Sequence, residues 1–119
     1  MKANNRRAIA AKTSMAASNE WTTSLKALAD DSRLNLLAAL MKRPLHVNAL
    51  SETLQLSQYN VSKHLRILRN AGLVDSEIKG NRREYFIAPR LRQQLARNRN
   101  LLDLGCCTFR FDRLLKNRK

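Results

Sequence analysis

The sequence is short of the residues that most enzymes and membrane proteins need. It has only three glycines, and none belongs to a glycine-rich loop of the kind that holds phosphate groups. No grouping of His, Asp and Glu accompanies its two cysteines, so a thiol nucleophile would lack a base. No apolar run approaches the ~18 residues of a membrane-spanning helix. We therefore expect neither an enzyme nor a membrane protein.

Acidic residues are also scarce, since nine Asp and Glu stand against 23 Lys and Arg and the formal net charge is +14. Residues 20–56 hold four residues of each sign, whereas residues 57–99 hold ten basic and three acidic ones. A surplus of this size indicates a polyanionic partner. The basic residues lie on predicted helices and turns rather than in an amphipathic membrane anchor, so the expected partner is double-stranded DNA.

The chain is long enough for one domain with a limited core, so dimerisation is a plausible source of extra stability. Residues 1–19 carry no acidic group, and Lys12 interrupts their apolar stretch before it reaches the ~7–15 residues of a signal-peptide core. We expect a cytoplasmic protein in which residues 1–19 form a flexible basic arm. Residues 20–105 then form a domain for DNA binding and dimerisation, and residues 106–119 form a Cys-Cys segment with a basic tail.

One amphipathic helix is predicted between Ser57 and Gly72. Ser57 can accept hydrogen bonds from the first turn, and Gly72 can adopt the left-handed conformation that ends a helix. Val61, Leu65 and Leu68 recur at helical spacing and form its buried face. The other side of the helix is polar and basic, and it carries Gln58, Tyr59, Asn60, Ser62, Lys63 and Arg66.

Two helices are expected between Trp21 and Pro44. Asp30 and Asp31 close the first helix, Asp31 or Ser32 opens the second, and Pro44 stops it. The apolar stripes consist of Trp21, Leu25 and Leu28 in the first helix and of Leu34, Leu37, Leu40 and Met41 in the second.

A third short helix contains Val47, Leu50 and Leu54, and residues 55–57 join it to the amphipathic helix. This arrangement predicts a helix-turn-helix. Two strand-like runs follow at residues 73–79 and 83–87, and Gly80-Asn81-Arg82 predicts a tight turn between them. The cations around this turn favour phosphate or minor-groove contact over a merely soluble turn; the tip and its flanks carry Lys79, Asn81, Arg82 and Arg83.

A last helix is expected from Arg90 to Leu104, because leucines recur there among Arg, Gln and Asn. The stretch from Arg113 to Lys119 is expected to be a frayed basic end.

Three of these segments together resemble the ArsR (arsenic-responsive) family of winged helix-turn-helix repressors. They are residues 25–34, 56–65 and 68–74, and the resemblance extends from Trp21 to Pro89. It implies a mainly α fold with a small β-hairpin wing (α+β) that forms a homodimer through its first and last helices. It also implies a repressor that leaves an inverted-repeat operator when an inducer binds. Two-fold symmetry would place the reading helices about one DNA turn apart, ~34–36 Å.

The resemblance makes the amphipathic helix the one that reads DNA in the major groove. Gln58 suits adenine and Lys63 suits guanine, whereas Ser62 and the amides of the first turn suit phosphates. His64 lies at the edge of the buried face, where a structural or phosphate-bonding role is favoured over a metal ligand. The expected DNA-binding residues are Ser57, Gln58, Tyr59, Asn60, Ser62, Lys63, His64, Arg66, Lys79, Asn81, Arg82 and Arg83.

No metal site of the family carries over to this chain. The positions that hold a Cys-x-Cys pair in metal-sensing members look like His46 and Asn48, and residues 90–119 contain no histidine. The adjacent thiols of Cys106 and Cys107 offer a different site, which suits arsenite or oxidation. The alternative is that both are reduced thiols packed in the protein. We expect no other cofactor.

The leading hypothesis is therefore a dimeric, sequence-specific repressor, with Cys106 and Cys107 as candidate thiol sensors. Two alternatives remain open. One is a nonspecific architectural DNA-binding protein, and the other is an ArsR-like regulator without metal or redox sensing. Comparison of specific with nonspecific DNA affinity separates the first alternative from the leading hypothesis.

Overall fold

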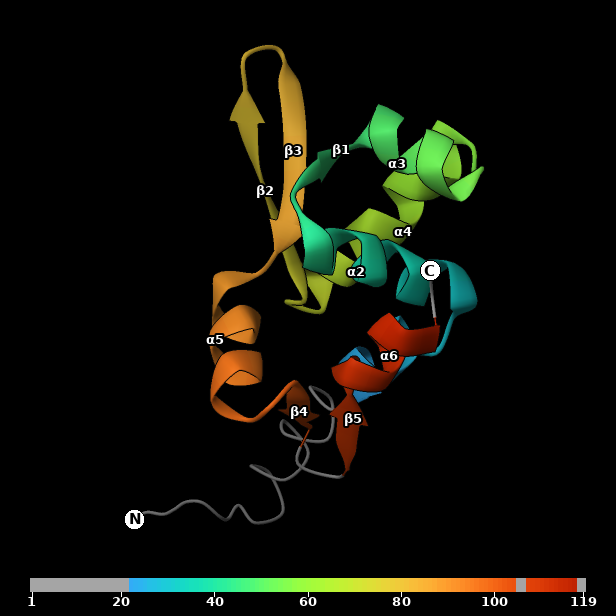
Figure 1. The fold of residues 1–119 in the computed structure, drawn as a ribbon. Coiled ribbons are helices and arrows are strands. Elements are labelled where there is room, and N and C mark those ends of the chain that lie inside the picture. Colours follow the sequence, from blue (N-terminus) through green and yellow to red (C-terminus); the bar gives the residue numbers. More distant parts are fainter. Residues whose placement is uncertain (1–21, 105–106, 118–119) are drawn as a thin grey trace, which may run out of the picture.

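The computed structural model describes residues 22–104 and 107–117 (Figure 1). The expected basic arm, Trp21 and Cys106 lie outside the described residues. Residues 22–28 are helical. The elements that follow are α2 (Asp31–Lys42), β1 (Leu45–His46), α3 (Val47–Leu54), α4 (Gln58–Asn70), β2 (Val74–Lys79), β3 (Arg82–Ile87), α5 (Pro89–Arg97), β4 (Leu101–Asp103), β5 (Thr108–Arg110) and α6 (Phe111–Asn117).

Helix α2 begins where a carboxylate can cap it. Asp30 has extended backbone angles, and its side chain accepts a hydrogen bond from the Arg33 N–H at 3.1 Å. We had expected Asp30 to close the preceding helix, but it caps α2 instead. At the other end Arg43 is extended, because a residue before proline is pushed out of the helical region, and Pro44 stops the helix as predicted.

The apolar stripe of α2 differs from the prediction. Leu37 and Leu40 are buried as expected, but Leu36 is fully buried as well, and Leu34 and Met41 are only partly buried. The reason is the central position of α2, which contacts α3, α4, α6 and β3. A helix covered from several sides buries more than one stripe, so periodicity alone does not identify its core residues.

The predicted helix-turn-helix is confirmed. After α3, Gln55 adopts a left-handed conformation (φ 56°), and its N–H donates to the Ser51 carbonyl. Ser57 then caps α4, with its hydroxyl oxygen accepting from the Asn60 N–H at 3.1 Å. Helix α4 ends before Gly72, whose φ of 79° is readily adopted only without a Cβ atom.

The predicted hairpin is also present, with a tighter turn. Arg82 pairs with Lys79, so it belongs to β3, and the loop consists of Gly80 and Asn81. Gly80 has a φ of 66°, as a two-residue hairpin loop demands at its first position. Strand β1 was not predicted, because its two residues are too few to show a period. It pairs with β3 and gives a three-stranded sheet in the order β1-β3-β2.

The predicted helix from Arg90 to Leu104 is wrong in its second half. Helix α5 ends at Arg97, and Arg99 and Asn100 adopt left-handed angles. After Leu95, helical spacing would need an apolar residue at position 98 or 99, where the sequence has Asn and Arg. Residues 101–103 instead form β4, which pairs with β5.

The frayed C-terminal end is likewise corrected, because residues 111–117 form helix α6. Phe111 is completely buried, Leu114 is nearly so, and both belong to the same core as α2. Phe111 packs edge-on against Phe109 with ring centroids 5.1 Å apart. In the first turn of α6, a bidentate hydrogen bond from Arg110 holds the pKa of Asp112 below its usual range.

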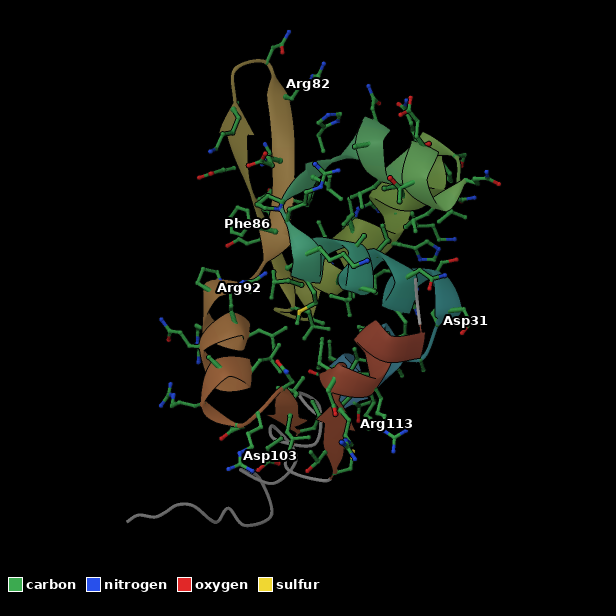
Figure 2. All side chains as sticks on the ribbon, viewed as in Figure 1. Asp31, Arg82, Phe86, Arg92, Asp103 and Arg113 are labelled. Atoms are coloured by element: carbon green, nitrogen blue, oxygen red, sulfur yellow. The ribbon has the colours of Figure 1, made fainter. Side chains whose placement is uncertain are left out.

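The elements are distributed toward two ends of the molecule. The tip of the β2–β3 hairpin projects at one end with β1 and α3 beside it, whereas α5 and the β4–β5 hairpin lie at the other end (Figure 1). Figure 2 shows Arg82 near the outer end of the hairpin and Asp103 at the opposite end. The core around α2 thus separates the tip of the hairpin from α5 and the β4–β5 hairpin (Figure 1).

The cap of α2 gives a prediction for stability and its pH dependence. Burial raises the pKa of Asp30, but the hydrogen bond from the Arg33 N–H and the Arg33 charge outweigh it, and the pKa falls below its ordinary 3.8. The carboxylate therefore stabilises the fold above pH 3.8, and this contribution disappears as the pH falls through the lowered pKa. We expect Asp30→Ala to lower the free energy of unfolding by about 1 kcal/mol at pH 7.

Urea denaturation across pH 2–7 measures this effect. The difference in the free energy of unfolding between Asp30→Ala and wild type should become smaller in acid. Asp30→Asn keeps a capping oxygen and serves as the matched control. It should retain most of the stability at pH 7, and an Asn variant as unstable as the Ala variant would contradict the capping role.

Candidate nucleic-acid interface

Helix α4 has one buried and one exposed side. Val61, Leu65 and Leu68 are completely buried against the core. Tyr59 keeps 77% of its surface exposed, the most of the large apolar side chains that the structure describes. The other exposed residues on and just before the helix are Ser57, Gln58, Asn60, Ser62, Lys63 and Arg66. The predicted reading face is thus an open surface with several hydrogen-bonding groups.

His64 departs from this set. It is half-buried, and its Nδ1 lies 3.2 Å from Nη1 of Arg33 on α2. This contact engages it inside the fold, so of the two roles predicted for His64 the geometry fits the structural one. Arg33 itself was not among the predicted site residues, because a single arginine in a helical stretch carries no sign of its partners.

The cations of the β2–β3 hairpin divide between its two faces, because side chains alternate along a strand. Arg83 is paired with Ile78 across the ladder, and its Nη1 donates to the Ser76 hydroxyl at 3.0 Å. Lys79 and Arg82 lie on the other face. The Lys79 ammonium lies 3.5 Å from a Glu77 oxygen and 3.9 Å from a Glu84 oxygen, and both glutamates share its face of the hairpin.

Arg82 connects the hairpin with the helix-turn-helix. Its Nη1 donates to Nε2 of His46 at 2.8 Å, while Nδ1 of the same ring lies 3.3 Å from the Ala49 N–H at the start of α3. A neutral imidazole has one acceptor nitrogen, so the two donors compete for it, and the shorter distance favours Arg82. The sequence analysis had noted His46 only as one of the positions where metal-sensing members of the family hold cysteines. Its place before α3 could not reveal a partner 36 positions away.

The positive charge along α4 is only partly neutralised. Arg69, near the end of the helix, lies 3.7 Å from an Asp75 carboxylate oxygen. Lys63 and Arg66 form no ion pair within residues 22–104 and 107–117. The exposed middle of α4 therefore keeps its full charge for a partner.

The cysteine pair can be placed only in part. Cys107 is exposed, and its carbonyl accepts a hydrogen bond from the Leu104 N–H at 2.9 Å. Cys106 lies outside the described residues, so the geometry of the pair stays untested. Within the part of the chain that the structure describes, no three His, Cys, Asp or Glu side chains gather where a metal ion could bind.

A helix-turn-helix whose second helix is followed directly by a hairpin is the arrangement of a winged helix-turn-helix domain, and solved structures share it. The structure covers 96% of HlyU from Vibrio cholerae N16961 and 76% of this chain, with a TM-score of 0.58 and 31% identity. It also matches the homodimeric winged helix-turn-helix DNA-binding domain of Mb0332 from Mycobacterium bovis. That match has a TM-score of 0.63 and 25% identity, over 83% of this chain and 93% of the other.

Sequence comparison agrees with this class. Residues 30–76 match the family described as "Bacterial regulatory protein, arsR family". The regulator NmtR of Mycobacterium tuberculosis (strain ATCC 25618 / H37Rv) is 42% identical over 64 residues, which cover 54% of this chain and 53% of NmtR. The chain belongs to the ArsR family of bacterial regulatory proteins.

A second curated relative matches over a similar share of its length. The transcriptional activator HlyU of Vibrio cholerae serotype O1 is 46% identical over 52 residues, which cover 44% of this chain and 48% of HlyU. The chain thus spans about half the length of the curated relatives it matches.

Proposed function

We propose that this protein is a sequence-specific transcriptional repressor that binds double-stranded DNA as a homodimer and leaves its operator when an inducer binds. The observation that carries the proposal is the open face of α4, together with a hairpin that holds Lys79, Arg82 and Arg83 near its tip. An α-helix fits the major groove, where base edges present distinct donor and acceptor patterns. Such a protein works where bacterial DNA lies, in the cytoplasm. No helix in residues 22–104 and 107–117 is long and apolar enough to cross a membrane.

The roles within the interface follow from the side chains. Gln58 and Lys63 are exposed on the first half of α4, where winged helices engage the groove most deeply, and both can donate to base edges. Ser57, Asn60 and Ser62 suit phosphate or sugar oxygens, and Tyr59 can contact a thymine methyl group or a sugar. Arg66 and the hairpin residues Lys79, Asn81, Arg82 and Arg83 are assigned to the phosphate backbone.

The proposed dimer is supported by the first helix more than by α5. Leu25 on the helix of residues 22–28 keeps 40% of its surface exposed. In contrast, Leu91 and Leu95 of α5 are buried within the chain, and the outer side of α5 is polar and basic. We therefore assign the main apolar contact between protomers to the first helix, whereas the family resemblance implies a dimer interface built by the first and last helices. The two-fold axis implies an inverted-repeat operator.

The function is tested by comparing binding to the promoter of the protein's own gene with binding to random duplex at matched salt. A regulator should prefer its site by about 10³-fold or more, whereas a ratio near one would favour an architectural protein. Gln58→Ala should relax the preference at one base position of each half-site in a binding-site selection. An unchanged selection would remove Gln58 from the reading residues. A reporter gene under this promoter distinguishes repression from activation. Its expression should rise when the protein is absent.

The charged wing gives a second prediction. Arg82→Ala should weaken binding to all sequences about equally and reduce the salt slope of log K by roughly one phosphate contact. Arg113→Ala is the control, because it changes the net charge equally at a side chain far from the wing (Figure 2). Titrations between 50 and 300 mM salt separate the two. Equal slopes for the two variants would show that Arg82 acts only through net charge.

We further propose the Cys106–Cys107 pair as the inducer site, with arsenite or an oxidant as the inducer class. Support comes from two adjacent thiols in a chain with no others and from the exposure of Cys107. The double variant Cys106→Ser, Cys107→Ser should bind the operator like wild type but no longer be released by arsenite or peroxide. Fluorescence anisotropy of labelled operator measures this. If arsenite or peroxide still released the double variant from the operator, the Cys106–Cys107 pair would not be the inducer site.

A further inference from the structure

A mostly buried arginine joins the helix of residues 22–28 to α2. Arg33 lies in the first turn of α2, and its side chain is 13% exposed. Its Nε donates to the Ala27 carbonyl at 2.8 Å, and its Nη2 donates to the Lys26 carbonyl at 3.0 Å. The last carbonyls of a helix lack partners one turn further along the chain, and Arg33 donates to two of them. The Lys26 carbonyl also accepts from the Ala29 N–H at 3.3 Å. The end of the first helix is therefore tied to α2.

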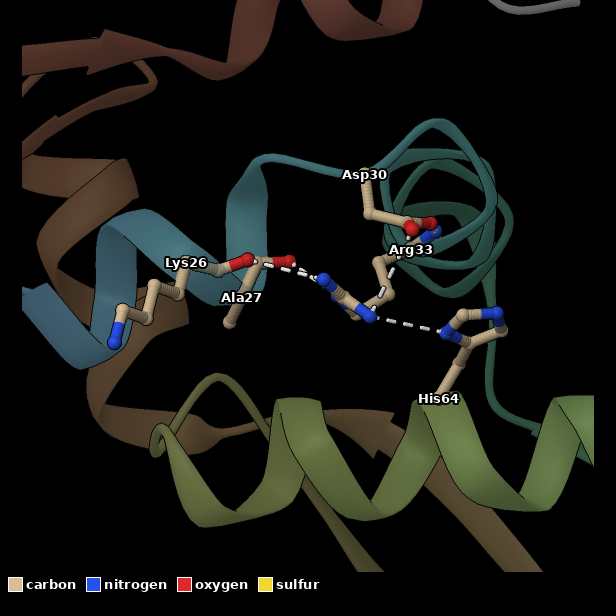
Figure 3. Close-up of polar contacts among 5 residues, drawn as sticks. All are labelled: Lys26, Ala27, Asp30, Arg33 and His64. Atoms are coloured by element: carbon tan, nitrogen blue, oxygen red, sulfur yellow. Dashed lines mark hydrogen bonds and ion pairs between the residues drawn. The ribbon is translucent and has the colours of Figure 1, made fainter.

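The same guanidinium reaches α4. Its Nη1 lies 3.2 Å from Nδ1 of His64 and 3.8 Å from Oδ2 of Asp30. Figure 3 shows His64 pointing from α4 toward Arg33, while the other nitrogens of Arg33 face Lys26 and Ala27. Because a guanidinium has no acceptor, His64 Nδ1 must be the acceptor, and the ring carries its proton on Nε2. One planar group on α2 thus contacts two other helical segments and the residue that caps its own helix.

This link differs in kind from the apolar packing around it. Val61, Leu65 and Leu68 hold α4 to the core, but apolar contacts have little directional preference. The planar fork of Arg33 presents its donors at fixed angles, so a rotation of α4 would break the bond to His64. Lys63 is the neighbour of His64 in the sequence, and therefore such a rotation would also turn the exposed reading face.

We propose that Arg33 and His64 are positioning residues that set the orientation of α4 for DNA reading and transmit movements of the helix of residues 22–28 to α4. This proposal rests on the proposed function for its DNA readout. It assigns no DNA contact to His64. The first helix, whose exposed side we assign to the dimer contact, is thereby linked to α4 by hydrogen bonds through one side chain.

Two substitutions of His64 form the core of the test. Asn places its Oδ1 as many bonds from the backbone as Nδ1 of histidine, so His64→Asn keeps the acceptor for Arg33. His64→Leu keeps comparable volume and removes the acceptor. We expect the Leu variant to bind the operator roughly fivefold to tenfold more weakly, with an unchanged salt slope, and the Asn variant to bind like wild type. A DNA contact through Nε2 would make both variants equally weak, which would overturn the proposal.

Hydrogen exchange of the DNA-free protein tests the positioning separately from DNA binding. Amides in the first half of α4 should exchange about threefold faster or more in His64→Leu than in wild type and should be restored in His64→Asn. Equal exchange in all three proteins would refute the positioning role even if the operator is bound. If the exchange pattern holds but no operator is preferred, the positioning role stands and the proposed function fails.

Arg33→Lys completes a double-mutant cycle with His64→Leu. Lysine keeps the charge but has a single nitrogen, whereas Arg33 uses three nitrogens to bind Lys26, Ala27 and His64. A lysine therefore cannot form all three hydrogen bonds at once. If both residues act through one link, the double variant should lose little more affinity than the more affected single variant. Fully additive losses would show that the two residues act independently.

Discussion

The reading surface depends on how firmly the apolar side of α4 is held in the core. Val61, Leu65 and Leu68 are completely buried, and full burial of a side chain of this size contributes roughly 1.5–3 kcal/mol. These three contacts fix which side of the helix faces solvent. Because helical geometry then leaves Gln58 and Lys63 outside, the open polar face is a consequence of the core. In the proposed function, a substitution that loosened α4 would therefore reduce the DNA specificity without changing any residue that contacts DNA.

Polar contacts refine what the core leaves approximate. Arg33 joins three helical segments through hydrogen bonds, and Arg82 ties the wing to the start of α3 through His46. Both arginines therefore act between elements. They differ in exposure: the Arg33 side chain is mostly enclosed, whereas the Arg82 contact is exposed and open to exchange with a phosphate. The first suits a fixed orientation of α4, and the second suits the phosphate contact that we propose for Arg82.

The sequence predicted the reading half of the fold well because its signals there are local. Ser57 and Gly72 mark the ends of α4, and Gly80 marks the hairpin turn, so each boundary depends on one or two residues. The C-terminal half was predicted poorly for the same reason. Its leucines suggested one long helix, but β4 and β5 form only because they pair with each other, and α6 is held by Phe111 in a core built by distant segments.

By itself the sequence determined the helix-turn-helix, the wing, the family and the basic character of the reading half, since caps, turns, periodicity and charge are written in neighbouring residues. Only the tertiary structure decided that Leu36 is core, that β1 joins the sheet, and that His64 faces Arg33 rather than solvent. Those outcomes depend on which segments approach one another. Packing and hydrogen bonding between residues 31 or 36 positions apart leave no periodic mark along the chain.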